Sequence, residues 1–301
     1  MGHDAGVLVP SMIFRKNDMT NDKCLGHQPL PDYLDAYMKQ NLRACQLKEL
    51  EILKEIDRIC RLHQIPYWLD GGTLLGAVRH GGFIPWDDDI DIAMRLEDLS
   101  RFKEAALREL RPEFFLQTAE TDPECPVTGV KVRDMNSLCI EGREDMTARY
   151  QKGLFVDIFP FIDYPDMSAR TVKRVAKGIC KSHAILHAPH PYTLRAVAEL
   201  VKFTTLNVWY HIEWKFLCAT RKKGTYLSNI LTNNGYGIMH RIDSVYPIGE
   251  IQFEGYTFCA PHNPDAYLKD LYKNYMQLPP EDKRKGHAAF LCPVLVSAEK
   301  E

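Results

Sequence analysis

The stretch that decides the fold reads Ile84-Pro85-Trp86-Asp87-Asp88-Asp89-Ile90-Asp91-Ile92-Ala93-Met94, with four aspartates in five residues between apolar neighbours. Successive side chains of an extended strand alternate faces, so the pattern predicts an apolar face and a face carrying Asp87, Asp89 and Asp91. Adjacent carboxylates repel each other in a half-buried setting, and a divalent cation with hard oxygen ligands relieves that repulsion. The stretch therefore predicts a Mg²⁺ or Mn²⁺ site.

Length and composition exclude several classes of protein. The chain has 301 residues, 45% of them hydrophobic, and a formal net charge of −2. It is long enough to bury a substantial core, as one large domain or two small ones, and neither disorder nor a fibrous repeat fits. Its nine cysteines include no Cys-x-x-Cys pair, so neither zinc-ligand spacing nor a disulfide framework is indicated. Reduced cysteines and a cytoplasmic location are the expectation.

The N-terminal region carries no targeting signal that can be recognised. Residues 1–30 are polar and patternless, without a basic segment followed by an apolar one, and we expect a loosely structured tail. No window of the chain approaches the roughly 18 uninterrupted apolar residues of a membrane span. A soluble protein is therefore expected.

Hydrophobic periodicity and turn residues give an order of elements. Helices are expected at 42–63, 73–79, 99–110, 169–187, 194–220 and 265–275. Strands are expected at 67–69, 89–94, 130–133 and 154–159, with a hairpin at 251–259. No internal repeat or low-complexity linker is visible. We therefore predict an α/β (α+β) fold, with residues 31–301 forming one domain that has a mixed sheet, flanking helices and a helical insertion at about 165–240.

Two further features point to phosphoryl chemistry. Gly71-Gly72 lies between an expected strand and a helix start, where missing side chains let a phosphate approach the first helical N–H groups. The aspartates follow on the next strand, which would pair beside the first. Asp157 lies between apolar residues on another strand and is the natural third carboxylate. The alternatives are an ordinary glycine turn and a structural hydrogen-bond acceptor.

These residues also resemble a known family. The segments 71–80, Gly-Gly-Thr-Leu-Leu-Gly-Ala-Val-Arg-His, and 84–91 closely resemble the signature of the LicD family, which includes bacterial choline-phosphate transferases. The resemblance is dense over 67–94 and continues more sparsely through 131–133, 155–160 and 267–287. It implies a nucleotidyltransferase-like fold in which Gly71-Gly72, Asp89, Asp91 and Asp157 form the characteristic pattern.

The resemblance also implies a reaction. A phospho-alcohol group, such as phosphocholine, would pass from a CDP-linked donor to a hydroxyl of a cell-surface glycan or its lipid-linked precursor. Asp89, Asp91 and Asp157 would be the catalytic residues, and with Asp87 they would hold Mg²⁺ or Mn²⁺. Asp88 has the opposite strand parity and is expected to support the strand start or the ligands.

Several polar residues are candidates for binding the substrate. Lys131 and Arg133 share one strand face and could contact donor phosphates, although solvated edge charges are the simpler interpretation. Arg79 and His80 lie at the end of the short helix expected at 73–79, and Gly71, Gly72 and Thr73 lie at its start. We expect these seven residues to contact substrate, Trp86 to pack in the core, and His287 to be only a weak site candidate.

The middle of the chain is basic, with eleven Lys and Arg against three Asp and Glu between positions 165 and 224. One interpretation is a helical cap with an apolar inner face and a solvated basic rim. The other is a docking surface for an anionic acceptor polymer or a lipid-linked precursor, with peripheral membrane contact. Nucleic acid is not expected as a partner, because the isoelectric point is about 6.6 and no nucleic-acid motif is present.

Other functions compete with the LicD-like reaction. A metal-dependent glycosyltransferase also uses an Asp-x-Asp site with a sugar nucleotide, and a nucleotidyltransferase would release pyrophosphate. A non-catalytic scaffold is disfavoured, because a buried acidic cluster without a cation would destabilise the fold. The sequence alone does not identify the alcohol, the acceptor, the metal or the oligomeric state.

Overall fold

The computed structural model describes residues 31–125, 129–141, 148–188, 190–222 and 224–295, so the predicted tail at 1–30 lies outside the described residues. The helices are α1 (Asp32–Leu62), α2 (Gly71–His80), α3 (Leu96–Glu109), α4 (Ala169–Leu186), α5 (Leu194–Thr220), α6 (Ile242–Val245) and α7 (Pro264–Tyr272). The strands are β1 (Trp68–Leu69), β2 (Ile90–Arg95), β3 (Phe114–Gln117), β4 (Val130–Asp134), β5 (Leu138–Glu141), β6 (Phe155–Tyr164), β7 (Tyr226–Asn229), β8 (His240–Arg241), β9 (Gly249–Phe253), β10 (Tyr256–Ala260) and β11 (Ala288–Cys292).

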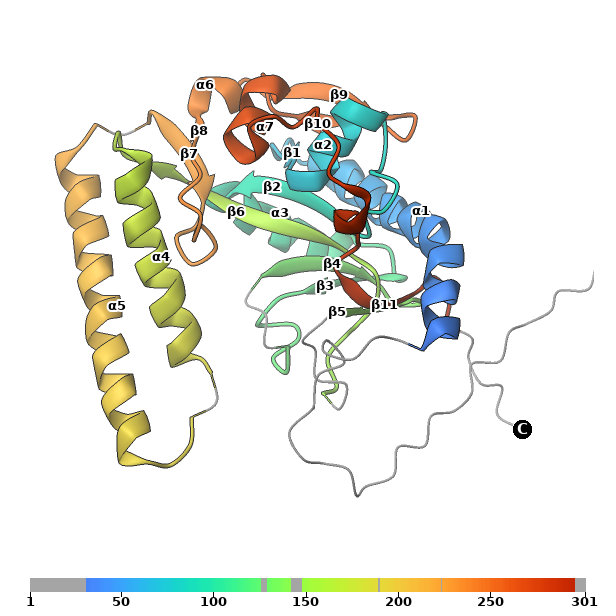
Figure 1. Ribbon diagram of the computed structural model, residues 1–301. Coiled ribbons are helices and arrows are strands. Elements are labelled where there is room, and N and C mark those ends of the chain that lie inside the picture. The colour runs from blue at the N-terminus through green and yellow to red at the C-terminus, as the bar shows by residue number, and fades with distance from the viewer. Residues whose placement is uncertain (1–30, 126–128, 142–147, 189, 223, 296–301) are drawn as a thin grey trace, which may run out of the picture.

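A mixed sheet organises the part of the chain that the structure describes (Figure 1). Five strands follow the order β1-β2-β6-β4-β3, while β7 pairs with the outer part of β6 and β8 pairs with β7. Strands β2 and β6 run parallel, and the other pairs in this sheet are antiparallel. Two small antiparallel pairs, β9 with β10 and β5 with β11, complete the strands.

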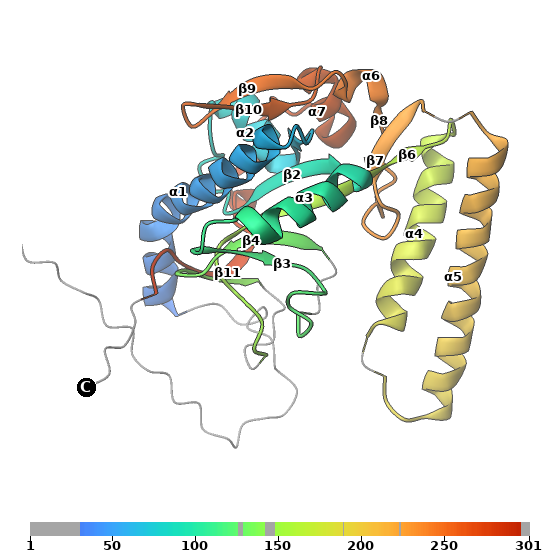
Figure 2. The same cartoon turned by 180° about the vertical axis from the view of Figure 1, so that it is seen from behind.

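Helices α1 and α3 cover one face of the sheet, as Figure 2 shows, while α2, α7 and the β9–β10 hairpin gather at the β1 edge. The long helix α1 presents apolar side chains at helical spacing, including Ile52, Leu53, Ile56 and Ile59, all of which are fully buried. They join one core cluster with side chains of β1, β2 and β6. This core holds β1 and β2 in place, and the acidic stretch leads directly into β2.

Local sequence signals define the short helix α2. The Asp70 side chain accepts a hydrogen bond from the Gly71 N–H and caps the N-terminus. The C-cap is Gly81 in the left-handed conformation (φ 71°), which glycine adopts without steric cost. The helix therefore begins beside β2 and ends at the loop that leads into the acidic stretch.

The helical insertion is a hairpin of α4 and α5 that projects from one end of the sheet (Figures 1 and 2). Ser168 and Thr193 cap its two helices by accepting hydrogen bonds from backbone N–H groups one turn on. The segment after α5 returns to the sheet as β7 and β8. No helix among the described residues has the length and apolar character needed to cross a bilayer.

The predicted fold class, a mixed sheet with flanking helices and a helical insertion, is confirmed. Several element predictions were incomplete. Strand β2 begins at Ile90, so Asp87, Asp88 and Asp89 precede it and strand alternation applies only from there on. Helix α1 begins ten residues earlier than expected, at Asp32, because acidic residues favour its first turn. Strands β3, β5, β7, β8 and β11 were not predicted.

Candidate functional site

The N-terminus of α2 lies directly against two carboxylates. A Cβ atom added to Gly71 would lie 2.9 Å from Asp91 Oδ2, and one added to Gly72 would lie 2.7 Å from Asp87 Oδ2. Both distances are shorter than a normal contact, so the missing side chains make room for carboxylates. The Thr73 hydroxyl accepts a hydrogen bond from the Asp91 N–H at 2.8 Å. The Gly-Gly motif and the acidic stretch therefore form one unit.

Three neighbouring strands place charged side chains in a row. Asp91 of β2 is in register with Asp157 of β6, and Asp157 is in register with Lys131 of β4. The Lys131 ammonium group donates to Asp157 Oδ2 at 3.1 Å and to Glu141 Oε2 at 3.2 Å. The two predicted carboxylates from distant segments are thus adjacent, with a buried cation beside one of them.

Burial controls the electrostatics of these carboxylates. It raises the pKa of Asp87 to about 7 and raises the pKa of Asp91 well above its ordinary value, and the Asp89 carboxylate adds to both effects. Burial also raises the pKa of Asp157, against the opposing effect of Lys131. Burial and mutual repulsion favour the neutral, protonated form of these carboxylates. A bound cation would favour their ionised form.

A second approach to the acidic stretch comes from the C-terminal part of the chain. Asp88 accepts hydrogen bonds from the backbone N–H groups of His287 and Ala288, each at 2.8 Å. His287 Nδ1 lies 3.5 Å from Asp88 and 3.4 Å from Asp89, and these contacts raise the pKa of His287 to about 11. One ligand atom each of Asp87, Asp88, Asp89 and His287 lies within 4.8 Å of the others. His287, only a weak candidate in the sequence, contacts the acidic stretch directly.

Sequence reasoning missed Glu49. This α1 residue is 1% exposed, and its Oε2 atom has no hydrogen-bond partner. Burial is the main reason why the pKa of Glu49 lies well above its ordinary value. The negative charges of the nearby aspartates raise this pKa further, and Asp89 has the largest effect among them. The sequence signal that could have identified Glu49 is its position, because it is an acidic residue on the apolar face of an amphipathic helix, between Cys45 and Leu53.

The remaining predicted contacts occupy different places. Arg79 donates to the Tyr275 backbone oxygen at 3.0 Å, and His80 meets Trp86 edge-on with ring centroids 6.4 Å apart. Arg133 is buried on β4 and donates to Gln117 Oε1 at 2.6 Å and to a backbone carbonyl. Lys131 therefore joins the carboxylates, while Arg133 ties β4 to its neighbours and Arg79 and His80 lie at the far end of α2.

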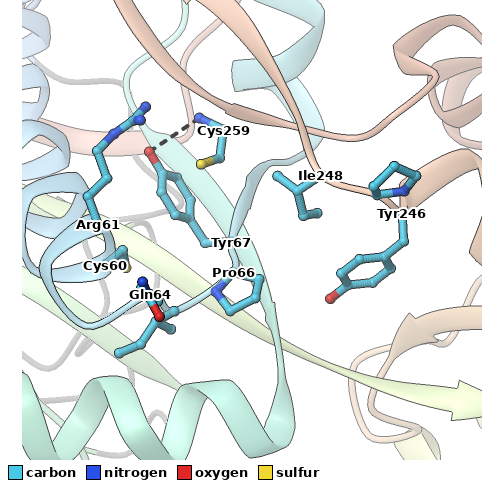
Figure 3. Close-up of a pocket in the computed structure, with 10 residues that line it drawn as sticks. Cys60, Arg61, Gln64, Pro66, Tyr67, Tyr246, Ile248 and Cys259 are labelled. Carbon is cyan, nitrogen blue, oxygen red and sulfur yellow. Dashed lines mark hydrogen bonds between the residues drawn. The ribbon is translucent and has the colours of Figure 1, made fainter.

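A cavity of about 410 Å³ lies elsewhere, between the end of α1, the connection from α1 to β1, the segment before β9, and β10. Its walls include Tyr67, Tyr246 and Ile248, and the Tyr67 hydroxyl accepts a hydrogen bond from the Cys259 N–H (Figure 3). None of the carboxylates described above lines this cavity. It is therefore separate from the acidic site.

Comparison with known proteins found similar sequences. Residues 64–186 match the family model described as LicD/FKTN/FKRP, nucleotidyltransferase domain, so the match includes α2, the acidic stretch and Asp157. The lipopolysaccharide cholinephosphotransferase LicD of Haemophilus influenzae is 29% identical over 259 residues, which are 83% of this chain and 96% of that protein. The human ribitol 5-phosphate transferase FKRP is 41% identical over 70 residues, 23% of this chain but only 14% of that protein. Residues 64–186 thus resemble the nucleotidyltransferase domain of the LicD family, and the similarity to these two proteins supports a LicD-type transferase.

Proposed function

We propose that this protein is a metal-dependent phosphotransferase. It would move a phospho-alcohol group, such as phosphocholine, from a CDP-linked donor to a hydroxyl of a glycan or its lipid-linked precursor. The observation that carries the proposal is the register of Asp91 with Asp157, beside the glycine start of α2 that accommodates Asp87. The two transferases similar to this chain, which are named for choline phosphate and ribitol 5-phosphate, support the type of group transferred.

The residues present fit a divalent cation. The buried carboxylates repel one another. The buried Glu49 Oε2 atom has no hydrogen-bond partner, which is the state expected of an oxygen that binds a cation. We assign Asp87, Asp89, Asp91 and Asp157 to the metal, with Glu49 as an added ligand or a support. When bound, Mg²⁺ or Mn²⁺ would neutralise charge on the diphosphate of the donor.

Asp88 and His287 are assigned a different role. The His287 side chain is 75% exposed, and its Nδ1 atom lies 3.5 Å from Asp88 and 3.4 Å from Asp89, an ion-pair geometry at the rim of the site. Asp88 already accepts two backbone hydrogen bonds. We therefore propose that Asp88 anchors the segment around His287, and that His287 supplies positive charge at the rim of the site.

The chain's own residues would carry the transfer as follows. The acceptor oxygen forms a bond to the phosphorus of the donor, and the bond to the departing cytidine monophosphate breaks. A carboxylate oxygen of Asp157 would take the proton of the attacking hydroxyl, and Lys131 would hold that carboxylate in place. Gly71, Gly72 and Thr73 would shape the pocket, with Arg79 and His80 toward its outer end.

Thermal-shift and product measurements test this proposal. We expect CDP-choline, CDP-ribitol or CDP-glycerol to raise the unfolding temperature only when Mg²⁺ is present, and Asp89→Ala to abolish the response. Asp163→Ala is the matched control, because Asp163 lies on β6 but pairs with Arg95 outside the acidic site. Released cytidine monophosphate supports the phosphotransferase. Released pyrophosphate, or a response to sugar nucleotides alone, would overturn it in favour of a nucleotidyltransferase or a glycosyltransferase.

A lipid-linked acceptor would have to be met at a bilayer. Peripheral contact of the basic insertion at 165–240 with a membrane is therefore part of the proposal. Nucleic acid is not among the proposed partners.

A further inference from the structure

The outer face of α5 is apolar and exposed. Its side chains recur at spacings of three, four and seven residues and therefore share one face of the helix. They are Leu194, Val197, Val201, Val208, Trp209, Ile212 and Phe216, and each is more than half exposed. Trp209 and Phe216, the largest, are 62% and 65% exposed. An exposed apolar face of this kind marks an interaction surface.

The opposite face of α5 already has its partner, helix α4. Tyr210, Trp214 and Leu217 pack with the apolar residues of α4 in one cluster. A Cβ atom added to Gly178 of α4 would lie 2.4 Å from the Tyr210 ring, so the two helices are in close contact. The outer face therefore does not serve the stability of the hairpin.

The hairpin that carries this face is strongly basic. The hairpin carries ten Lys and Arg residues against two glutamates between positions 169 and 222. Lys202 and Lys215 are exposed and border the apolar face of α5 on its two sides. Arg174 is paired with Glu213, which leaves Glu199 as the other acidic residue of the hairpin.

Two occupants of this face can be compared on charge. A second copy seated on the same face would bring two strongly basic hairpins together, which like-charge repulsion opposes. An anionic phospholipid surface complements the basic residues and accepts the exposed aromatic rings at the level of its headgroups. The helix does not qualify as a membrane span, which fits a segment that lies on the bilayer.

We infer that α5 docks this protein on the surface of an anionic bilayer, with Trp209 and Phe216 inserted between lipids and with lysines contacting the headgroups. The inference deepens the proposed function, because it identifies the surface at which a lipid-linked acceptor would be reached. It can nevertheless fail separately, since docking requires neither donor nor metal.

Vesicle co-sedimentation of the full chain tests the inference, without nucleotide or metal. We expect binding to phosphatidylcholine vesicles that contain about one third phosphatidylserine, little binding to pure phosphatidylcholine, and loss of binding as salt increases. Trp209→Ala and Phe216→Ala should each weaken binding by roughly tenfold, since each removes a large inserted side chain. Leu107→Ala, at an apolar α3 residue that is 62% exposed, is the control and should bind like the parent protein.

Three results would overturn the inference. One is the absence of binding to anionic vesicles at low salt, by a chain whose circular dichroism and unfolding temperature are normal. Another is a concentration-dependent dimer that Trp209→Ala dissociates, which would assign the face to a second copy. The milder variants Lys202→Gln and Lys215→Gln leave the apolar face intact, and an unchanged salt dependence in both would also contradict docking on anionic lipid.

Discussion

The acidic site and the α4–α5 hairpin place residues in opposite surroundings. The site buries charged groups, among them Glu49, Asp87 and Lys131, whereas the hairpin exposes large apolar groups such as Trp209. Both arrangements cost free energy in an isolated protein, because buried charges lose hydration and exposed apolar surface orders water. The two costs suggest two partners: a cation and substrate for the site, and an apolar, anionic surface for the hairpin.

The two regions also differ in how they are assembled. The acidic site combines side chains that are distant in the sequence, from α1, the stretch leading into β2, β4 and β6, and strand register aligns Asp91, Asp157 and Lys131. The hairpin is formed by two consecutive helices that pack on each other. A change in the site should therefore affect chemistry more than global stability, and a change in the contact between α4 and α5 should do the reverse.

The largest expected effect is that of Asp91→Asn. We expect turnover to fall about 10²–10³-fold, because the change removes several kcal/mol of charge stabilisation by a metal ligand. The unfolding temperature without metal should stay the same or rise, because a buried like-charge repulsion is relieved. Activity assays and thermal unfolding with and without Mg²⁺ check both parts. A fully active variant would contradict the role of Asp91.

A matched glycine pair sharpens the comparison. Gly72→Ala and Gly178→Ala each add a methyl group within a helix, where alanine is favoured by about 1 kcal/mol, but each clash costs about 1–3 kcal/mol. The first methyl meets the Asp87 carboxylate at 2.7 Å, and the second meets the Tyr210 ring at 2.4 Å. We expect Gly72→Ala to lose the Mg²⁺-dependent shift, and Gly178→Ala to keep it while unfolding at lower temperature. Equal metal responses in the two variants would remove the distinction between the regions.

The smallest expected effect concerns the loop before the acidic stretch. Glu254 accepts hydrogen bonds from Arg43 of α1 and from the Phe83 N–H, and the Arg43 bond holds its pKa below the ordinary value of 4.5. A lowered carboxyl pKa gives stability that is present above pH 4.5 and is lost as the pH falls below it. Glu254→Gln should cost about 1 kcal/mol near neutral pH. Denaturant unfolding at pH 7 and pH 4 should show this difference shrinking in acid, and a constant difference would refute it.

Much of the fold and the candidate site could be predicted from local signals. Helix periodicity indicated α3, α4 and α5, and glycine and aspartate spacing identified α2 and the acidic stretch. The pairing of β1 with β2, across the connection that contains α2, was also expected. These features depend on neighbouring residues, which a single sequence displays directly.

The remaining features depend on long-range contacts. Short strands such as β3 and β11 exist because distant partners pair with them, and their own residues carry no strong period. Glu49 was missed because an acidic residue on an apolar helix face becomes informative only when its neighbours are known. The role of Asp88 was similarly hidden, since its partners are the backbone N–H groups of His287 and Ala288.

The parallel pairing of β2 with β6 has a consequence for the folding of newly made chains. A slip of one residue would place Val156 or Ile158 opposite Asp91 and would turn Asp157 to the other side of the sheet, toward apolar neighbours. A chain with this wrong register would therefore bury the Asp157 carboxylate among apolar side chains and would lack that carboxylate in the acidic site. Enzymatic turnover by a preparation of this protein should thus report directly on the fraction of molecules that completed this long-range step correctly.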